Sequence, residues 1–260
     1  MGQPRRSEMR ESMQQDRHFD GAYWSAAVAE RVEEHADQKA FSEQDPEALA
    51  VPLVLLSAAI AASRAALGVL ASSYSGGIDV DRVHWFEEAR TSFLRAREIH
   101  AEIDTDDLWF DVASRRGVHD WALDLSSWAF VLGRAVPDVD LWTGGGRDAL
   151  LVALASADPE VEGTSLWPQT YAPLVTALGA SRGHAAEDVR AFLQSRLRTS
   201  AGASWAGTLQ DAQRHPEDLR YHGYWSFEAA AVVKLLGIDE SSFKDAPYYP
   251  AGLVQRPLTG

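Results

Sequence analysis

The sequence has 260 residues and no cysteine, which removes several classes of site at once. Without a thiol the chain cannot form a disulfide, a thiolate zinc site, an iron–sulfur cluster or a cysteine nucleophile. Basic residues are also scarce, since 24 Lys and Arg face 38 Asp and Glu and give a formal net charge of −14. This charge disfavours direct binding of a nucleic-acid backbone and suits a basic partner.

Familiar enzyme and targeting motifs are missing as well. The sequence contains no His-Glu-x-x-His and no Gly-x-Ser-x-Gly, and the glycines at 144–146 lack the Lys-Ser/Thr of a phosphate-binding loop. The polar N-terminus lacks the apolar core of a secretory signal, so we expect a protein of the bacterial cytoplasm. Residues 48–71 carry one charge, Arg64, but are rich in alanine and interrupted by Pro52. They predict a buried core helix and no membrane contact.

No segment shows the alternation of a β-strand, whereas apolar residues recur at helical spacing along most of the chain. With 9 Trp, 9 Phe and 7 Tyr to fill a core, the pattern predicts an all-α fold of about eight or nine helices without a substantial sheet. Turn residues cluster near 134–147, so we expect two helical parts, 1–133 and 134–260, packed as one unit. The predicted helices lie at 8–43, 46–72, 82–103, 118–133, 147–156, 168–178, 185–198 and 217–236.

One residue pair suggests metal chemistry. His119 and Asp120 form an HD dipeptide at a predicted helix start, and His84 lies on an earlier helix. All-α metal-dependent phosphohydrolases use such a pair with further ligands, so this activity is the alternative function. No further ligands are evident from the spacing. The competing interpretation places Asp120 on the solvated face of its helix, and it predicts no metal, no other cofactor and no catalytic residue.

Acidic residues are dense where one predicted helix ends and the next loop begins. Like charges four residues apart cost a helix stability, so they are unfavourable for local structure. The segment is either a solvated loop or a docking surface that mimics phosphates for a basic partner. The predicted partner-binding residues are Glu98, Glu102, Asp104, Asp106, Asp107 and Asp111.

The C-terminal segment is rich in aromatic residues and contains an acidic residue, Glu228, among apolar neighbours. A buried carboxylate must be hydrogen-bonded or paired, and Tyr224 lies one helical turn earlier as a candidate donor. We interpret this glutamate as a structural anchor rather than a catalytic acid. The predicted structural residues are Tyr224, Trp225, Phe227, Glu228, Tyr248 and Tyr249.

The run GYWSFEAAAVVKLLGID at 223–239, followed by SSFKDAPYYPAGLV at 241–254, resembles the C-terminal signature of the PoNi-like immunity proteins. The N-terminal part, with Arg10, Phe19 and Tyr23, resembles the companion N-terminal domain of the same family less specifically. The sequence departs from the signature at residues 251–252, where Ala-Gly replaces a more polar pair.

This resemblance implies an all-α binder that protects a bacterium from a PoNe-type DNase toxin delivered between competing cells by a secretion system. It implies one protein partner, the cognate nuclease, and neither an enzyme activity nor a cofactor. The acidic composition agrees, because a cleft that grips DNA is basic and attracts an acidic inhibitor. Inhibition by covering the cleft and inhibition by trapping an inactive conformation both remain open. A helical scaffold with an unrelated partner is the other binding hypothesis.

Overall fold

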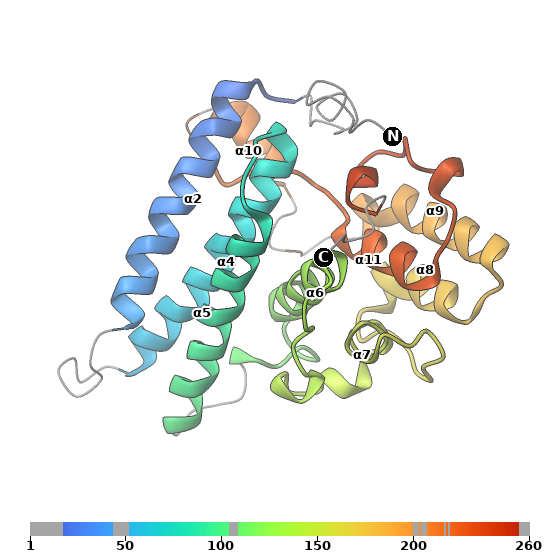
Figure 1. Cartoon of the computed structure of the whole chain (residues 1–260), viewed down its shortest axis with the longest axis horizontal. Helices are drawn as coiled ribbons and strands as arrows, with labels where there is room; N and C mark the ends of the chain where they lie inside the picture. The colour runs from blue at the N-terminus through green and yellow to red at the C-terminus, as the bar shows by residue number, and fades with distance from the viewer. Residues whose placement is uncertain are drawn as a thin grey trace, which may run out of the picture. The chain divides into compact units, whose positions relative to one another are not determined.

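The computed structural model describes residues 18–43, 52–103, 109–199, 203, 207–215, 217 and 219–254. These residues form nine α-helices and no strand, and they include only two isolated β-bridges, Asp111–Thr143 and Asp148–Thr164. The all-α prediction is confirmed. The described residues fold into two compact units, and each unit combines two separate stretches of sequence (Figure 1). We call residues 18–103 and 208–223 the N-terminal unit and residues 109–199 and 224–254 the C-terminal unit.

The N-terminal unit is organised around one apolar helix, α4. Its helices are α2 (Gly21–Ser42), α4 (Pro52–Gly76), α5 (Arg82–Glu102) and α10 (Thr208–Arg214). Helix α4 packs against α2 on one side and α5 on the other, and the three long helices run alongside one another (Figure 1). By length and composition α4 could cross a membrane, but 72% of its most apolar window is buried within the protein. This degree of burial is typical of a core helix, which is what the alanine-rich sequence predicts.

Residues that follow α10 close one end of this unit. The hydroxyl of Tyr23 donates to the carbonyl of Tyr221 over 3.1 Å, and Ser75 Oγ donates to the carbonyl of His222 over 2.8 Å. The Tyr221 ring also lies 5.8 Å from the ring of Trp24. Residues 221 and 222 are thereby fixed to α2 and α4, through partners that lie 198 and 147 positions earlier in the sequence.

The C-terminal unit contains five α-helices and four short 3₁₀ turns among its described residues. The α-helices are α6 (Arg116–Leu132), α7 (Ala149–Ser156), α8 (Pro168–Gly179), α9 (Arg182–Thr199) and α11 (Phe227–Leu236). The 3₁₀ turns are η2 (Val139–Leu141), η3 (Gly145–Arg147), η4 (Glu240–Ser242) and η5 (Ala251–Leu253). Helix α11 packs against α6, and Lys234 near its end donates to the carbonyls of Phe130 and Val131 at the end of α6. Burial lowers the pKa of this lysine.

Several predicted helix boundaries are corrected. Helix α2 begins only at Gly21, where Asp20 caps it by accepting from two backbone N–H groups, while residues 8–17 lie outside the described residues. Residues 221–226 are not helical, so the helix predicted over 217–236 begins only at Phe227, with Ser226 as its N-cap. Helix α10 was not predicted. The division after residue 133 differs from the two compact units and stays a prediction about sequence regions.

Candidate functional site

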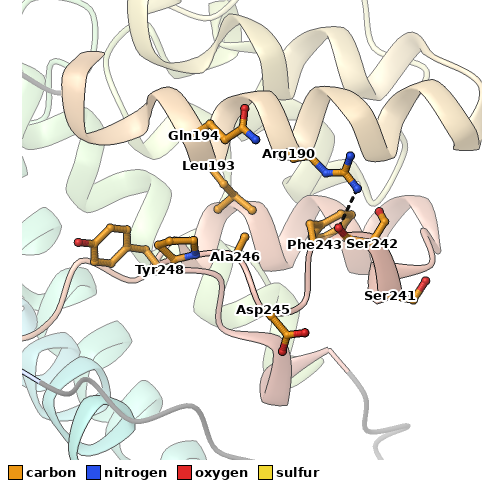
Figure 2. Close-up of a pocket in the computed structure, with 10 residues that line it drawn as sticks. Arg190, Leu193, Gln194, Ser241, Ser242, Phe243, Asp245, Ala246 and Tyr248 are labelled. Carbon is orange, nitrogen blue, oxygen red and sulfur yellow. Dashed lines mark hydrogen bonds between the residues drawn. The ribbon is translucent and has the colours of Figure 1, made fainter.

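An open pocket lies between α9 and the loop that follows α11. Its volume is about 470 Å³, and α9 forms one wall while residues 241–248 form the other (Figure 2). Arg190 bridges the walls, because its Nη2 donates to the carbonyl of Ser242 over 2.7 Å. The lining residues are Arg190, Leu193, Gln194, Ser241, Ser242, Phe243, Asp245, Ala246, Pro247 and Tyr248.

The loop wall of this pocket is held by contacts within the C-terminal unit. The hydroxyl of Tyr249 donates to Glu240 Oε2 over 2.6 Å, and the Tyr249 ring meets Phe243 edge-on at 5.0 Å. The N–H of Ser226 donates to the carbonyl of Tyr248 over 2.8 Å, which ties the loop to the start of α11. Tyr248 has a φ of 66°, a left-handed conformation that is uncommon for a residue with a large side chain. Such a conformation persists only where its surroundings enforce it.

A buried ion pair supports the other side of the same region. Arg196 on α9 donates from Nε to Glu228 Oε1 over 3.0 Å, and both side chains are buried. The same guanidinium donates to the carbonyls of Tyr224 over 2.8 Å and Trp225 over 3.2 Å. Burial disfavours the charged arginine, but the attraction of Glu228 outweighs it and raises the pKa of Arg196. The pair therefore anchors the non-helical segment before α11 to α9.

Glu228 is buried, as its apolar neighbours indicate, but its partner differs from the predicted one. Arg196 accounts for its ion pair, and Tyr224 contributes a backbone carbonyl to the arginine instead of a hydroxyl to the glutamate. The sequence does carry a signal for this arginine. It lies three and four positions after two residues of the apolar stripe, Leu193 and Phe192, and hence on the buried face of α9.

The HD dipeptide forms part of a second buried network. His119 is fully buried, with Nε2 3.0 Å from Asp148 Oδ2. Asp148 also accepts from the N–H of Leu166, and its other oxygen caps α7. Burial alone would lower the pKa of His119 and raise that of Asp148. The neighbouring carboxylates of Asp120 and Asp148 outweigh burial and raise the pKa of His119, while the hydrogen bond and charge of His119 lower the pKa of Asp148.

Asp120 is buried, so its predicted place on a solvated helix face is wrong. Its Oδ1 accepts from Arg116 Nε over 2.7 Å and from the Tyr171 hydroxyl over 3.0 Å. Burial raises the pKa of this carboxyl, but His119 and Arg116 lower it by more, and the net pKa is lowered. The amphipathic pattern missed this residue because its partners compensate for the burial of a charge.

The residues proposed for metal chemistry lie in different surroundings. His84 belongs to the N-terminal unit, near the start of α5, where Asp81 caps the helix. His119 and Asp120 belong to the C-terminal unit and take part in the buried network described above. Among the described residues, no group of three or more His, Cys, Asp or Glu is placed to hold a metal ion.

The predicted partner-binding acids have different environments. Glu98 and Glu102 are exposed on the last turns of α5, and Glu98 forms a long, 3.5 Å contact with Arg95. Asp111 lies in the C-terminal unit and caps a turn by accepting from the N–H groups of Ala113 and Ser114. The hydrogen bond from the Ser114 side chain, above all, lowers the pKa of Asp111. The remaining acids, Asp104, Asp106 and Asp107, lie outside the described residues.

Most of the predicted structural residues lie in the interior of the C-terminal unit. Tyr224, Trp225, Phe227, Glu228 and Tyr249 are buried. Tyr248 differs because it is half-buried and lines the pocket. The ring of Phe227 packs 4.5 Å from that of Trp128 on α6. These aromatic residues therefore build the frame around the pocket, and one of them forms part of its surface.

Comparison with known proteins identifies this region. Residues 146–253 match the family model described as the PoNe immunity proteins (PoNi), C-terminal. Over these residues the chain is similar to the C-terminal region of the PoNi proteins. The resemblance of residues 223–254 to the PoNi signature is thus confirmed, and it assigns an immunity role with a cognate toxin as partner in general terms. The match does not include Arg10, Phe19 or Tyr23, so the N-terminal resemblance stays a prediction.

A solved structure shares the fold over nearly the whole chain. The crystal structure of protein PA2201 from Pseudomonas aeruginosa aligns with a TM-score of 0.64, covering 96% of this chain and 92% of that chain at 19% identity. At this identity the likeness shows a common fold alone. A search of curated protein sequences returned no significant match. The pocket, the Arg196–Glu228 pair and Asp148 all lie within the PoNi C-terminal region.

Proposed function

We propose that this protein binds and neutralises a cognate PoNe-type DNase toxin in the bacterial cytoplasm, without catalysis of its own. The match of residues 146–253 to the PoNi immunity proteins is the observation that carries this proposal. A neutralising protein needs a specific interface, for which roughly 1,600 Å² of buried surface is typical. Such an interface requires neither a metal nor a nucleophile.

Charge supports an acidic contact surface over the basic DNA-binding cleft of the toxin. The net charge of −14 attracts a basic partner at long range, and such steering raises association rates by about 10- to 1,000-fold. Glu98 and Glu102 are exposed at the end of α5, where the helix dipole makes acidic residues unfavourable for the helix itself. Together with Asp104, Asp106, Asp107 and Asp111 they form our proposed acidic surface.

The direct test is co-expression in a bacterium with the nuclease domain encoded beside this gene, reading cell survival and the integrity of chromosomal DNA. We expect rescue and co-purification of a stable complex. An inactive nuclease domain serves as the control for expression burden. Continued killing while this protein is soluble and abundant would contradict the proposal for that toxin, and rescue without a complex would contradict neutralisation by binding.

The acidic surface has its own test. Replacing Asp104, Asp106 and Asp107 by Lys should slow association with the toxin and weaken its salt dependence, since steering acts on the association rate. We expect the melting temperature to stay nearly constant. The matched control replaces three exposed acids of the C-terminal unit, Asp158, Glu160 and Glu162, and so makes the same charge change. If the two variants slow association equally, net charge alone acts. If neither variant changes association, the proposed acidic surface is contradicted.

A further inference from the structure

The pocket between α9 and residues 241–248 has the construction of a binding site. Leu193 and Phe243 are buried beneath it, whereas Gln194 and Asp245 are exposed at its rim (Figure 2). Its volume of about 470 Å³ lies within the range of roughly 300–1,000 Å³ that is usual for ligand pockets. Its whole lining belongs to the region that matches the PoNi proteins.

The pocket walls are fixed without a ligand. Arg190 joins them through the Ser242 carbonyl, while Ser226 and Glu240 hold the loop through Tyr248 and Tyr249. A pocket held in this way loses little conformational freedom when it is filled, which favours tight binding. The left-handed backbone of Tyr248 marks the same loop as a place where the fold tolerates strain.

The charges of the lining determine which occupant fits. One cation, Arg190, and one anion, Asp245, are its only charged members, so the lining as a whole is neutral. Because these two charges offset one another, the lining favours neither an anionic nor a cationic side chain. Within the described residues, Arg190 makes one hydrogen bond, so its other N–H groups are available to an oxygen atom of an incoming group. An aromatic ring with a polar edge fits this lining, because its apolar face can pack on Leu193 and Phe243 while its polar atom accepts a hydrogen bond from Arg190.

We propose that this pocket receives an uncharged aromatic side chain of the toxin, such as tyrosine, as an anchor of the complex. The proposal rests on the immunity function proposed above, because that function makes the partner a protein. Aromatic residues seated in well-formed pockets are the common hot spots of protein interfaces. The pocket and the acidic surface would then have separate roles, since a neutral pocket governs dissociation and exposed charges govern association.

The experiment fills the pocket and measures binding of the co-encoded nuclease domain by surface plasmon resonance. Ala246→Phe places a ring inside the pocket, and Gln194→Trp covers its mouth from an exposed position. We expect each variant to raise the dissociation rate constant at least tenfold, to leave the association rate within twofold, and to do so equally at low and high salt. The control, Ala172→Phe, adds the same ring at an exposed position on α8 outside the pocket.

The outcomes separate this inference from the proposed function. If the wild type binds and both folded variants dissociate at the wild-type rate, the pocket proposal is overturned and the immunity function stands. Should Ala246→Phe fail to fold, Gln194→Trp decides. If no toxin binds the wild type, the proposed function fails for that toxin.

A second measurement then tests the pocket directly by NMR titration with N-acetyl-tyrosinamide. We expect shifts at 190–194 and 241–248 that N-acetyl-argininamide does not cause. If these shifts are absent, the proposal is overturned. It is also overturned if N-acetyl-tyrosinamide causes the shifts but neither Ala246→Phe nor Gln194→Trp changes toxin binding.

Discussion

Removing the guanidinium of Arg196 should destabilise the C-terminal unit severely. Arg196→Met keeps the length of the side chain but leaves the buried Glu228 carboxylate without its cation. It also removes the donor from the carbonyls of Tyr224 and Trp225. Breaking a buried ion pair on one side costs about 3–5 kcal/mol, and an unsatisfied buried carbonyl adds about 1–3 kcal/mol unless the structure relaxes. We expect a loss of at least about 3 kcal/mol in the free energy of unfolding.

The magnitude is tested by urea unfolding, followed by circular dichroism and tryptophan fluorescence. The double variant Arg196→Met/Glu228→Leu removes both charges, and an apolar replacement of a whole buried pair is often neutral or stabilising. We therefore expect the double variant to be more stable than Arg196→Met by at least about 1 kcal/mol. The carbonyls of Tyr224 and Trp225 still lack their donor, so wild-type stability should not return in full. A loss below about 1 kcal/mol in Arg196→Met would refute the anchoring role of the pair.

Two further predictions concern other parts of the fold. The raised pKa of His119 means that its stabilising effect is fully present below its unfolded pKa of about 6.5 and is lost as pH rises through the folded value. The unfolding free energy of the wild type should therefore fall toward alkaline pH relative to His119→Gln, and parallel pH profiles would contradict this linkage. In the N-terminal unit, a Cβ added at Gly76 would lie 2.5 Å from Trp24 Cβ. Gly76→Ala should cost about 1–3 kcal/mol through overpacking in thermal melts, whereas Gly21→Ala, which meets nothing within 4 Å, should not. Equal melting temperatures for these two variants would remove the steric argument.

The predicted helix ends at residues 103, 133 and 236 lie within one residue of the observed ends, because neighbouring residues set them. Asp81 caps α5, and Gly133 and Gly237 end their helices in the left-handed conformation that glycine adopts at low cost. The start of α11 was predicted ten residues too early, at residue 217 instead of Phe227. Residues 221–226 do contain local signals that the predicted helix overlooked, since Gly223 has a φ of 91° and Ser226 caps α11. Distant partners add to them, because Tyr23 and Ser75 bind the carbonyls of Tyr221 and His222.

In the candidate site, too, local sequence features were predictable and contacts between distant residues were not. Composition and apolar context predicted that Glu228 would be buried, but its partner Arg196 lies 32 positions away and only the fold brings the two together. Asp120 was misplaced because helical periodicity cannot reveal that Tyr171 lies across from it. The sequence alone did not predict the pocket, since its walls come from two separate stretches that the fold brings together.

The order in which the chain visits its two units has a consequence for its synthesis. The N-terminal unit contains residues 18–103 but is completed by residues 208–223, which follow most of the C-terminal unit in sequence. At roughly 5–20 residues per second, a ribosome needs on the order of ten seconds to travel from one stretch to the other. During that interval the nascent helices lack Tyr221, whose carbonyl and ring meet Tyr23 and Trp24 in the finished protein. The N-terminal unit therefore cannot close until residues 208–223 have been made, after most of the C-terminal unit has been synthesised.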